Sequence, residues 1–89
     1  MNNDAIAEIV NAALIEEFEL DPEKVSPDAH IRDDLGLDSL DIVDMVIVLE
    51  KAFHFKLHDK EPLTKIRTLG DVYAFIAALR DEGTITAGQ

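Results

Sequence analysis

Apolar residues recur at the spacing of an α-helix in three stretches of the chain. These stretches are residues 3–18, residues 39–53 and the segment from Leu69 to Gly83. In each stretch the apolar positions gather on one face, which predicts three amphipathic helices around a common core. The predicted core residues are Ile6, Ile9, Val10, Ala13, Leu14 and Phe18, then Ile42, Met45, Val46, Leu49 and Phe53, then Leu69, Val72, Tyr73, Ile76 and Leu79. No run alternates with the period of a strand.

Capping residues mark where the helices begin. Asn3 or Asp4 is predicted to cap the first helix, because a short polar side chain can accept a free backbone N–H there. Asp38 is predicted to cap the second helix, and Asp41 follows at the position of a capping-box partner. Thr68 and Asp71 repeat this spacing before the third helix, and Gly83 is a natural stop.

A long connection, residues 19–37, separates the first two helices. Pro22 and Pro27 interrupt helical continuity, and Gly36 allows a tight turn into the second helix. A connection this long is unusual in so small a domain and indicates a functional role. Its spaced apolar residues are expected to hold it against the core: Val25, Ile31, Leu35 and Leu37.

Pro62 favours a further short helix over residues 61–66, because proline is well suited to a first helical turn. The predicted fold is therefore all-α, a four-helix bundle of three main helices and one short helix, with a long loop between the first and second helices. Eighty-nine residues make a single domain, residues 1–89, with room for one core. Residues 82–89 lack periodicity and are expected to form a disordered tail.

The helix over residues 39–53 carries a second apolar stripe opposite its core face, made of Leu40, Val43 and Ile47. Asp44 and Lys51 share this stripe, while Asp41 and Glu50 flank it. A helix that is apolar on two sides is either fully buried or has a second partner. The charges within the stripe argue against full burial and favour a docking surface.

The charge balance narrows the choice of partner. Nineteen acidic side chains stand against eight basic ones, which gives a net charge of −11. Such a chain is repelled by nucleic acid and by anionic lipid, and is steered towards proteins with basic patches. The sequence has no membrane-spanning run or signal-peptide pattern, so we expect no stable membrane insertion. The absence of cysteine fits a reducing cytoplasm.

Several chemistries are disfavoured by the residues present. Ser39 lies in no nucleophile-elbow pattern, and a helical domain of this size has little room for a water-excluding site. His54 and His58 are four apart but lack further zinc ligands, and the acidic run from Asp33 to Asp41 fails the calcium-loop pattern. No metal site is predicted. Ser39 is then either a plain helix-start residue or a site modified by another protein, and local physics leaves both open.

The segment Leu35-Gly36-Leu37-Asp38-Ser39-Leu40-Asp41 resembles the prosthetic-group attachment motif of acyl carrier proteins. The similarity extends over about residues 4–80. It implies that a phosphopantetheinyl transferase, using coenzyme A and Mg²⁺, attaches 4′-phosphopantetheine to Ser39, which Asp38 and Leu40 flank. It further implies a monomeric cytoplasmic carrier that is not an enzyme and holds acyl groups as thioesters on the arm.

The resemblance also assigns roles to two sets of residues. The recognition helix would meet basic patches on acyl-transferring and acyl-processing enzymes through Leu40, Asp41, Val43, Asp44, Ile47 and Glu50. The candidate acyl pocket is lined by Val46, Leu49, Phe53, Leu57, Ile66 and Tyr73. Lys51, where family members often carry acid, leaves fatty acid synthesis and a specialised lipid or polyketide pathway both open. An amino-acyl or peptidyl carrier and an unmodified acidic interaction module are the alternatives.

Overall fold

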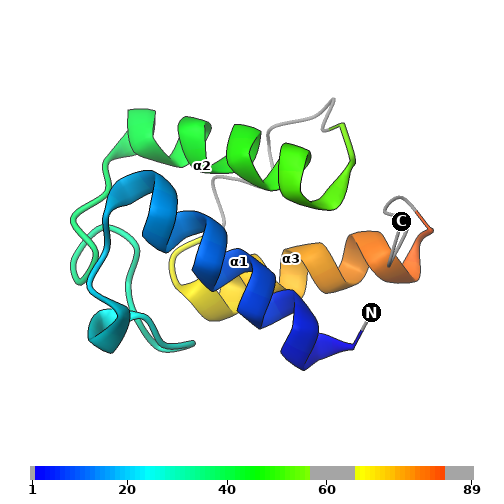
Figure 1. The fold of residues 1–89 in the computed structure, drawn as a ribbon, viewed down its shortest axis with the longest axis horizontal. Coiled ribbons are helices and arrows are strands. Elements are labelled where there is room, and N and C mark those ends of the chain that lie inside the picture. The colour runs from blue at the N-terminus through cyan, green and yellow to red at the C-terminus, as the bar shows by residue number, and fades with distance from the viewer. Residues whose placement is uncertain (1, 57–65, 84–89) are drawn as a thin grey trace.

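The structure is a computed structural model that describes residues 2–56 and 66–83. Its α-helices are α1 (Asn3–Phe18), α2 (Ser39–Phe53) and α3 (Leu69–Asp81), and a 3₁₀ turn, η1 (Pro22–Lys24), lies in the first loop (Figure 1). α1 packs against both α2 and α3. The prediction of an all-α fold with three main helices is confirmed, and the helix bounds agree closely with those expected from the periodicity.

The predicted core faces are the buried ones. α1 contributes three buried side chains to one continuous cluster, and α2 and α3 contribute four each. At the margin of this cluster, other predicted core residues are partly buried: Ile9, Phe18, Ile42 and Tyr73. The buried residues are Ile6, Val10 and Leu14 of α1, Met45, Val46, Leu49 and Phe53 of α2, and Leu69, Val72, Ile76 and Leu79 of α3.

The cap of α1 differs from the prediction. Asn2, rather than Asn3 or Asp4, caps the helix, and its Oδ1 accepts the backbone N–H of Ala5 at 2.8 Å. Asn3 and Asp4 already belong to the helix, whereas Asn2 has the extended backbone that a cap requires. Three consecutive residues can all accept this hydrogen bond, so side-chain type alone could not choose among them.

The long loop is fastened to the start of α3 by backbone hydrogen bonds. The N–H of Ile31 donates to the Arg67 carbonyl at 2.9 Å, and the N–H of Leu69 donates to the Ala29 carbonyl at 3.1 Å. His30 and Thr68 form an isolated antiparallel bridge at this point. All four apolar residues expected to anchor the loop are buried or partly buried against the core: Val25, Ile31, Leu35 and Leu37.

Two predicted segments fall largely outside the described residues. Of the short helix predicted over residues 61–66, only Ile66 lies within the described residues, and it is buried and not helical. The predicted tail lies outside the described residues from residue 84 onwards, while Glu82 and Gly83 form the turn that ends α3. The 3₁₀ turn η1 was not predicted from the sequence. Pro22 occupies its first position, and the Asp21 side chain accepts the N–H of Glu23. Within the described ranges, no helix is long and apolar enough to cross a membrane.

Candidate functional site

A tight turn over residues 30–37 delivers the chain to the start of α2. The N–H of Leu37 donates to the Ile31 carbonyl at 3.0 Å, and the buried Leu37 side chain anchors the end of the turn. Gly36 has a φ of +72°, in the left-handed region that favours glycine. The glycine predicted to allow this turn therefore has the required backbone conformation.

The capping box at the start of α2 is confirmed. The Asp38 Oδ1 accepts the N–H of Asp41 at 3.0 Å, and the Asp41 Oδ2 accepts the N–H of Asp38 at 3.1 Å. Ser39 is the first residue of the helix and is exposed. The box uses the N–H of Asp41. The N–H groups of Ser39 and Leu40, by contrast, have no hydrogen-bond partner among the described residues. They remain available at the positive end of the helix.

The Ser39 hydroxyl makes no hydrogen bond to any other described residue. A serine nucleophile needs a base within hydrogen-bond reach and a group that orients this base. In residues 2–56 and 66–83, the arrangement around Ser39 supplies neither. The exposed hydroxyl is instead open to an external enzyme, which is the geometry that a modification site requires.

The second apolar stripe of α2 lies on the surface. Leu40 is 76% exposed, Val43 40% and Ile47 41%, and these are the exposed large hydrophobic residues of the described chain. Asp44 and Lys51 are exposed beside them, whereas Asp41 and Glu50 are partly buried. The sequence pattern therefore predicted correctly which apolar side chains of α2 face outward.

Most of the candidate acyl-pocket residues lie in the core, as Val46, Leu49 and Phe53 are each at most 2% exposed. Ile66 is also buried, and Leu57 lies outside the described residues. Tyr73 is partly buried, and its hydroxyl donates a hydrogen bond to Asn11 Oδ1 on α1. Burial raises the pKa of the Tyr73 hydroxyl, and the hydrogen bond to Asn11 opposes that rise. The sheltering of an acyl chain by these residues stays a prediction.

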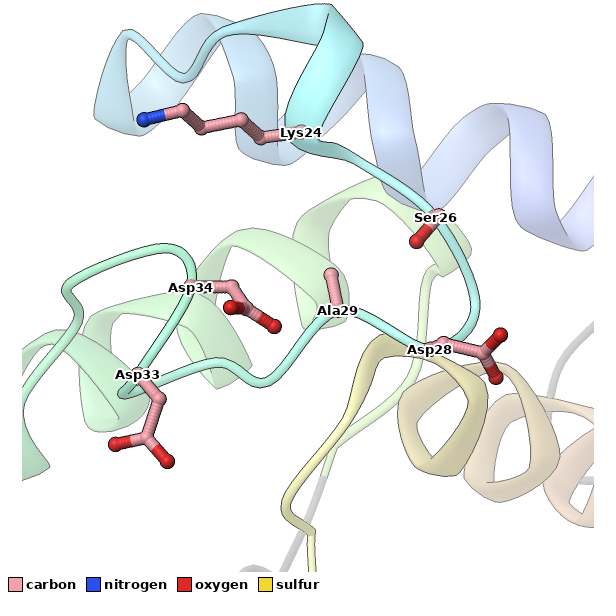
Figure 2. A pocket seen from close by; sticks show the side chains of 6 residues that line it. All are labelled: Lys24, Ser26, Asp28, Ala29, Asp33 and Asp34. Carbon is pink, nitrogen blue, oxygen red and sulfur yellow. The ribbon is translucent and has the colours of Figure 1, made fainter.

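A surface pocket of about 490 Å³ lies along the long loop (Figure 2) and was not anticipated from the sequence. Ser26 and Asp34 point towards the space between the loop segments, while Asp28 and Asp33 point outward (Figure 2). Lys24 and Ala29 complete the lining, so no predicted site residue borders this pocket. Among the described residues, no group of three or more His, Cys, Asp or Glu side chains is arranged to hold a metal ion.

Comparison with known proteins gives one family match and several similar relatives. A protein family described as "Phosphopantetheine attachment site" matches residues 8–76. An acyl carrier protein of Thermosynechococcus vestitus is 41% identical over 76 residues, which cover 85% of this chain and 93% of the relative. Acyl carrier proteins of Wolinella succinogenes and Helicobacter hepaticus are 38% and 39% identical, over 81% and 80% of this chain and 93% and 92% of theirs.

The family match identifies the chain as a protein with a covalent phosphopantetheine attachment site. With the relatives, it establishes that the chain belongs to the acyl carrier protein family. The chain is accordingly a carrier of acyl groups on 4′-phosphopantetheine rather than a catalyst. Membership of the family implies interaction with a phosphopantetheinyl transferase and with acyl-processing enzymes.

Proposed function

We propose that Ser39 is the residue that holds the 4′-phosphopantetheine arm. The observation that carries this proposal is the exposed Ser39 hydroxyl at the first position of α2, with no hydrogen bond to any other described residue. The chain contains one other serine, Ser26, which lies in the loop before Pro27. Ser39 alone follows a capping aspartate at a helix start, within the segment that matches the family.

The residues at the start of α2 fit a phosphate ester. The N–H groups of Ser39 and Leu40 are free to face an anion at the positive end of the helix. Asp38 and Asp41 bond to each other's backbone, so these carboxylates hold the helix start in place rather than hold the arm. When bound, the arm supplies a thiol for thioester formation, a group that this cysteine-free chain lacks.

The outer face of α2 is proposed as the docking surface for partner enzymes. Leu40, Val43 and Ile47 offer apolar contact, and Asp41, Asp44 and Glu50 offer negative charge to a basic patch. Charge complementarity of this kind mainly raises the association rate and fixes orientation. A small apolar stripe gives rapid release, which a carrier serving several enzymes in turn needs.

The acyl chain is proposed to lie near Val46, Leu49, Phe53, Leu57, Ile66 and Tyr73. Of these residues, Val46, Leu49, Phe53 and Ile66 belong to the buried core and Tyr73 packs against it. An acyl chain among them would be removed from water and favoured by burial of its methylene groups. The carrier is proposed to act as a monomer in the cytoplasm, in fatty acid synthesis or in a specialised lipid or polyketide pathway. The lack of cysteine supports a reducing compartment.

Loading the protein in vitro tests the attachment residue. The apo protein is incubated with coenzyme A, Mg²⁺ and a broad-specificity phosphopantetheinyl transferase, and intact mass is measured over time. Wild type and Ser26→Ala should gain the mass of one phosphopantetheine group, while Ser39→Ala should gain none. Loading of Ser39→Ala, or loss of loading in Ser26→Ala alone, would overturn the assignment of Ser39.

A further inference from the structure

Lys51 extends the exposed stripe of α2 at the end away from Ser39. At 100° per residue it projects within about 20° of Leu40, and it follows Ile47 by four residues on the same side of the helix. Its side chain is exposed and makes no hydrogen bond or ion pair with any described residue. The stripe therefore ends in a free positive charge within the part of the chain that the structure describes.

No carboxylate of α2 is placed to neutralise Lys51. The residues three and four positions before it, Val48 and Ile47, are apolar. Asp44 lies two helical turns away, about 10 Å along the axis, which exceeds the reach of a side-chain ion pair. Glu50 is adjacent in sequence and projects about 100° away around the helix.

A positive charge in the last turn of a helix is also stabilised by the helix dipole. Any exposed position in that turn would serve this purpose, so the dipole does not explain why the charge lies on the line of Leu40 and Ile47. His54 and Lys56, both exposed, follow at the same end of the helix. Asp38, Asp41 and Asp44 lie towards the Ser39 end of α2, while Glu50 flanks the stripe beside Lys51. Along the line of Leu40 and Ile47 itself, the end far from Ser39 carries the positive charge of Lys51.

We propose that Lys51 is a specificity-determining docking residue and that its partner is an enzyme with a polarised surface. That surface has an apolar pocket for the stripe, basic side chains opposite Asp41 and Asp44, and a carboxylate opposite Lys51. Opposite charges at the two ends admit one orientation along α2, because a reversed partner would place like charges together. The inference rests on the proposed docking role of α2 and names the chemistry of the partner.

The transferase from the same cell serves as the probe. The initial rate of loading is measured by intact mass against apo-protein concentration, at low salt and again at about 0.3 M salt. Lys51→Glu should lower kcat/KM about three- to tenfold at low salt, through KM, and the loss should shrink at high salt. Lys24→Glu is the matched control, because it makes the same charge change on η1, far from the C-terminal end of α2 (Figure 1).

Melting temperatures of all variants confirm folding before the rates are compared. A reduced kcat/KM for Lys51→Glu, with Lys24→Glu close to wild type, supports the proposal. Restoration of loading when the facing carboxylate of the transferase is changed to lysine supports it further. Equal or faster loading of Lys51→Glu overturns the proposal while the attachment site stands, whereas failure to load wild type overturns the proposed function itself.

Discussion

Asp38 and Asp41 hold the start of α2 by accepting each other's backbone N–H groups, at 3.0 and 3.1 Å. Ser39 lies between them in the sequence and takes its position from this reciprocal pair. Asp41 is also one of the residues that we propose to meet a basic partner. The same carboxylate thus has a structural role and a proposed docking role, so stability must be measured separately from docking in variants of this segment.

Replacing Asp38 with alanine should lower the free energy of unfolding by about 1 kcal/mol, because the N–H of Asp41 loses its acceptor. Urea unfolding followed by circular dichroism measures the change. Asp44→Ala is the control, since Asp44 is exposed on the same helix and makes no hydrogen bond to a described residue. If both variants lose the same stability, the loss belongs to removal of an aspartate in general and the capping role is contradicted.

A second capping box gives a pH-dependent prediction. Hydrogen bonds from the backbone N–H groups of Arg67 and Thr68, at 3.0 and 3.1 Å, lower the pKa of the Asp71 carboxyl below its ordinary value. The folded state therefore binds this proton less readily than the unfolded state. The resulting stabilisation is complete above about pH 4 and is lost as the pH falls through the folded pKa.

Asp71→Asn should accordingly be less stable than wild type at neutral pH, and the gap between the two should narrow below about pH 4. Urea unfolding of both proteins from pH 7 to pH 3 measures this gap. A gap that stays constant over the whole range would contradict a contribution from the charged form of Asp71.

The sequence predicted the elements whose signals are local. The two boxes, Asp38 with Asp41 and Thr68 with Asp71, follow from residues three positions apart. The outward direction of Leu40, Val43 and Ile47 followed from helical geometry alone, because residues on one helix share fixed angles.

Features that depend on backbone contacts between distant segments could not be predicted. The bridge between His30 and Thr68 and the bond from Ile31 to Arg67 involve main-chain atoms, which every residue possesses. α1 and α2 also end in residues with a left-handed backbone conformation, Glu19 and His54. Neither is the glycine that usually marks such a helix end in a sequence. The pairing of Tyr73 with Asn11 joins residues 62 apart and needed the packed helices to become visible.

Reversing the charge of Asp44 should slow docking on a basic surface. Asp44→Lys is expected to lower the association rate with the phosphopantetheinyl transferase, most strongly at low salt, where the Debye length is long. Stopped-flow mixing at several salt concentrations measures this rate. Glu8→Lys makes the same charge change on the exposed face of α1 and should have a smaller effect. Equal effects would mean that net charge, rather than the α2 face, steers the encounter.

Added cations should stabilise the folded protein, because the net charge of −11 makes like charges repel in the compact state. Relief of about 1 kcal/mol of repulsion would raise the melting temperature by about 5 °C in a domain of this size. Thermal unfolding is measured in MgCl₂ and in NaCl at matched ionic strength. An equal rise in both salts identifies screening, and a larger rise in MgCl₂ identifies divalent cations associating with the clustered carboxylates. A melting temperature indifferent to both salts would show that the carboxylates are spaced widely enough in the fold to avoid this repulsion.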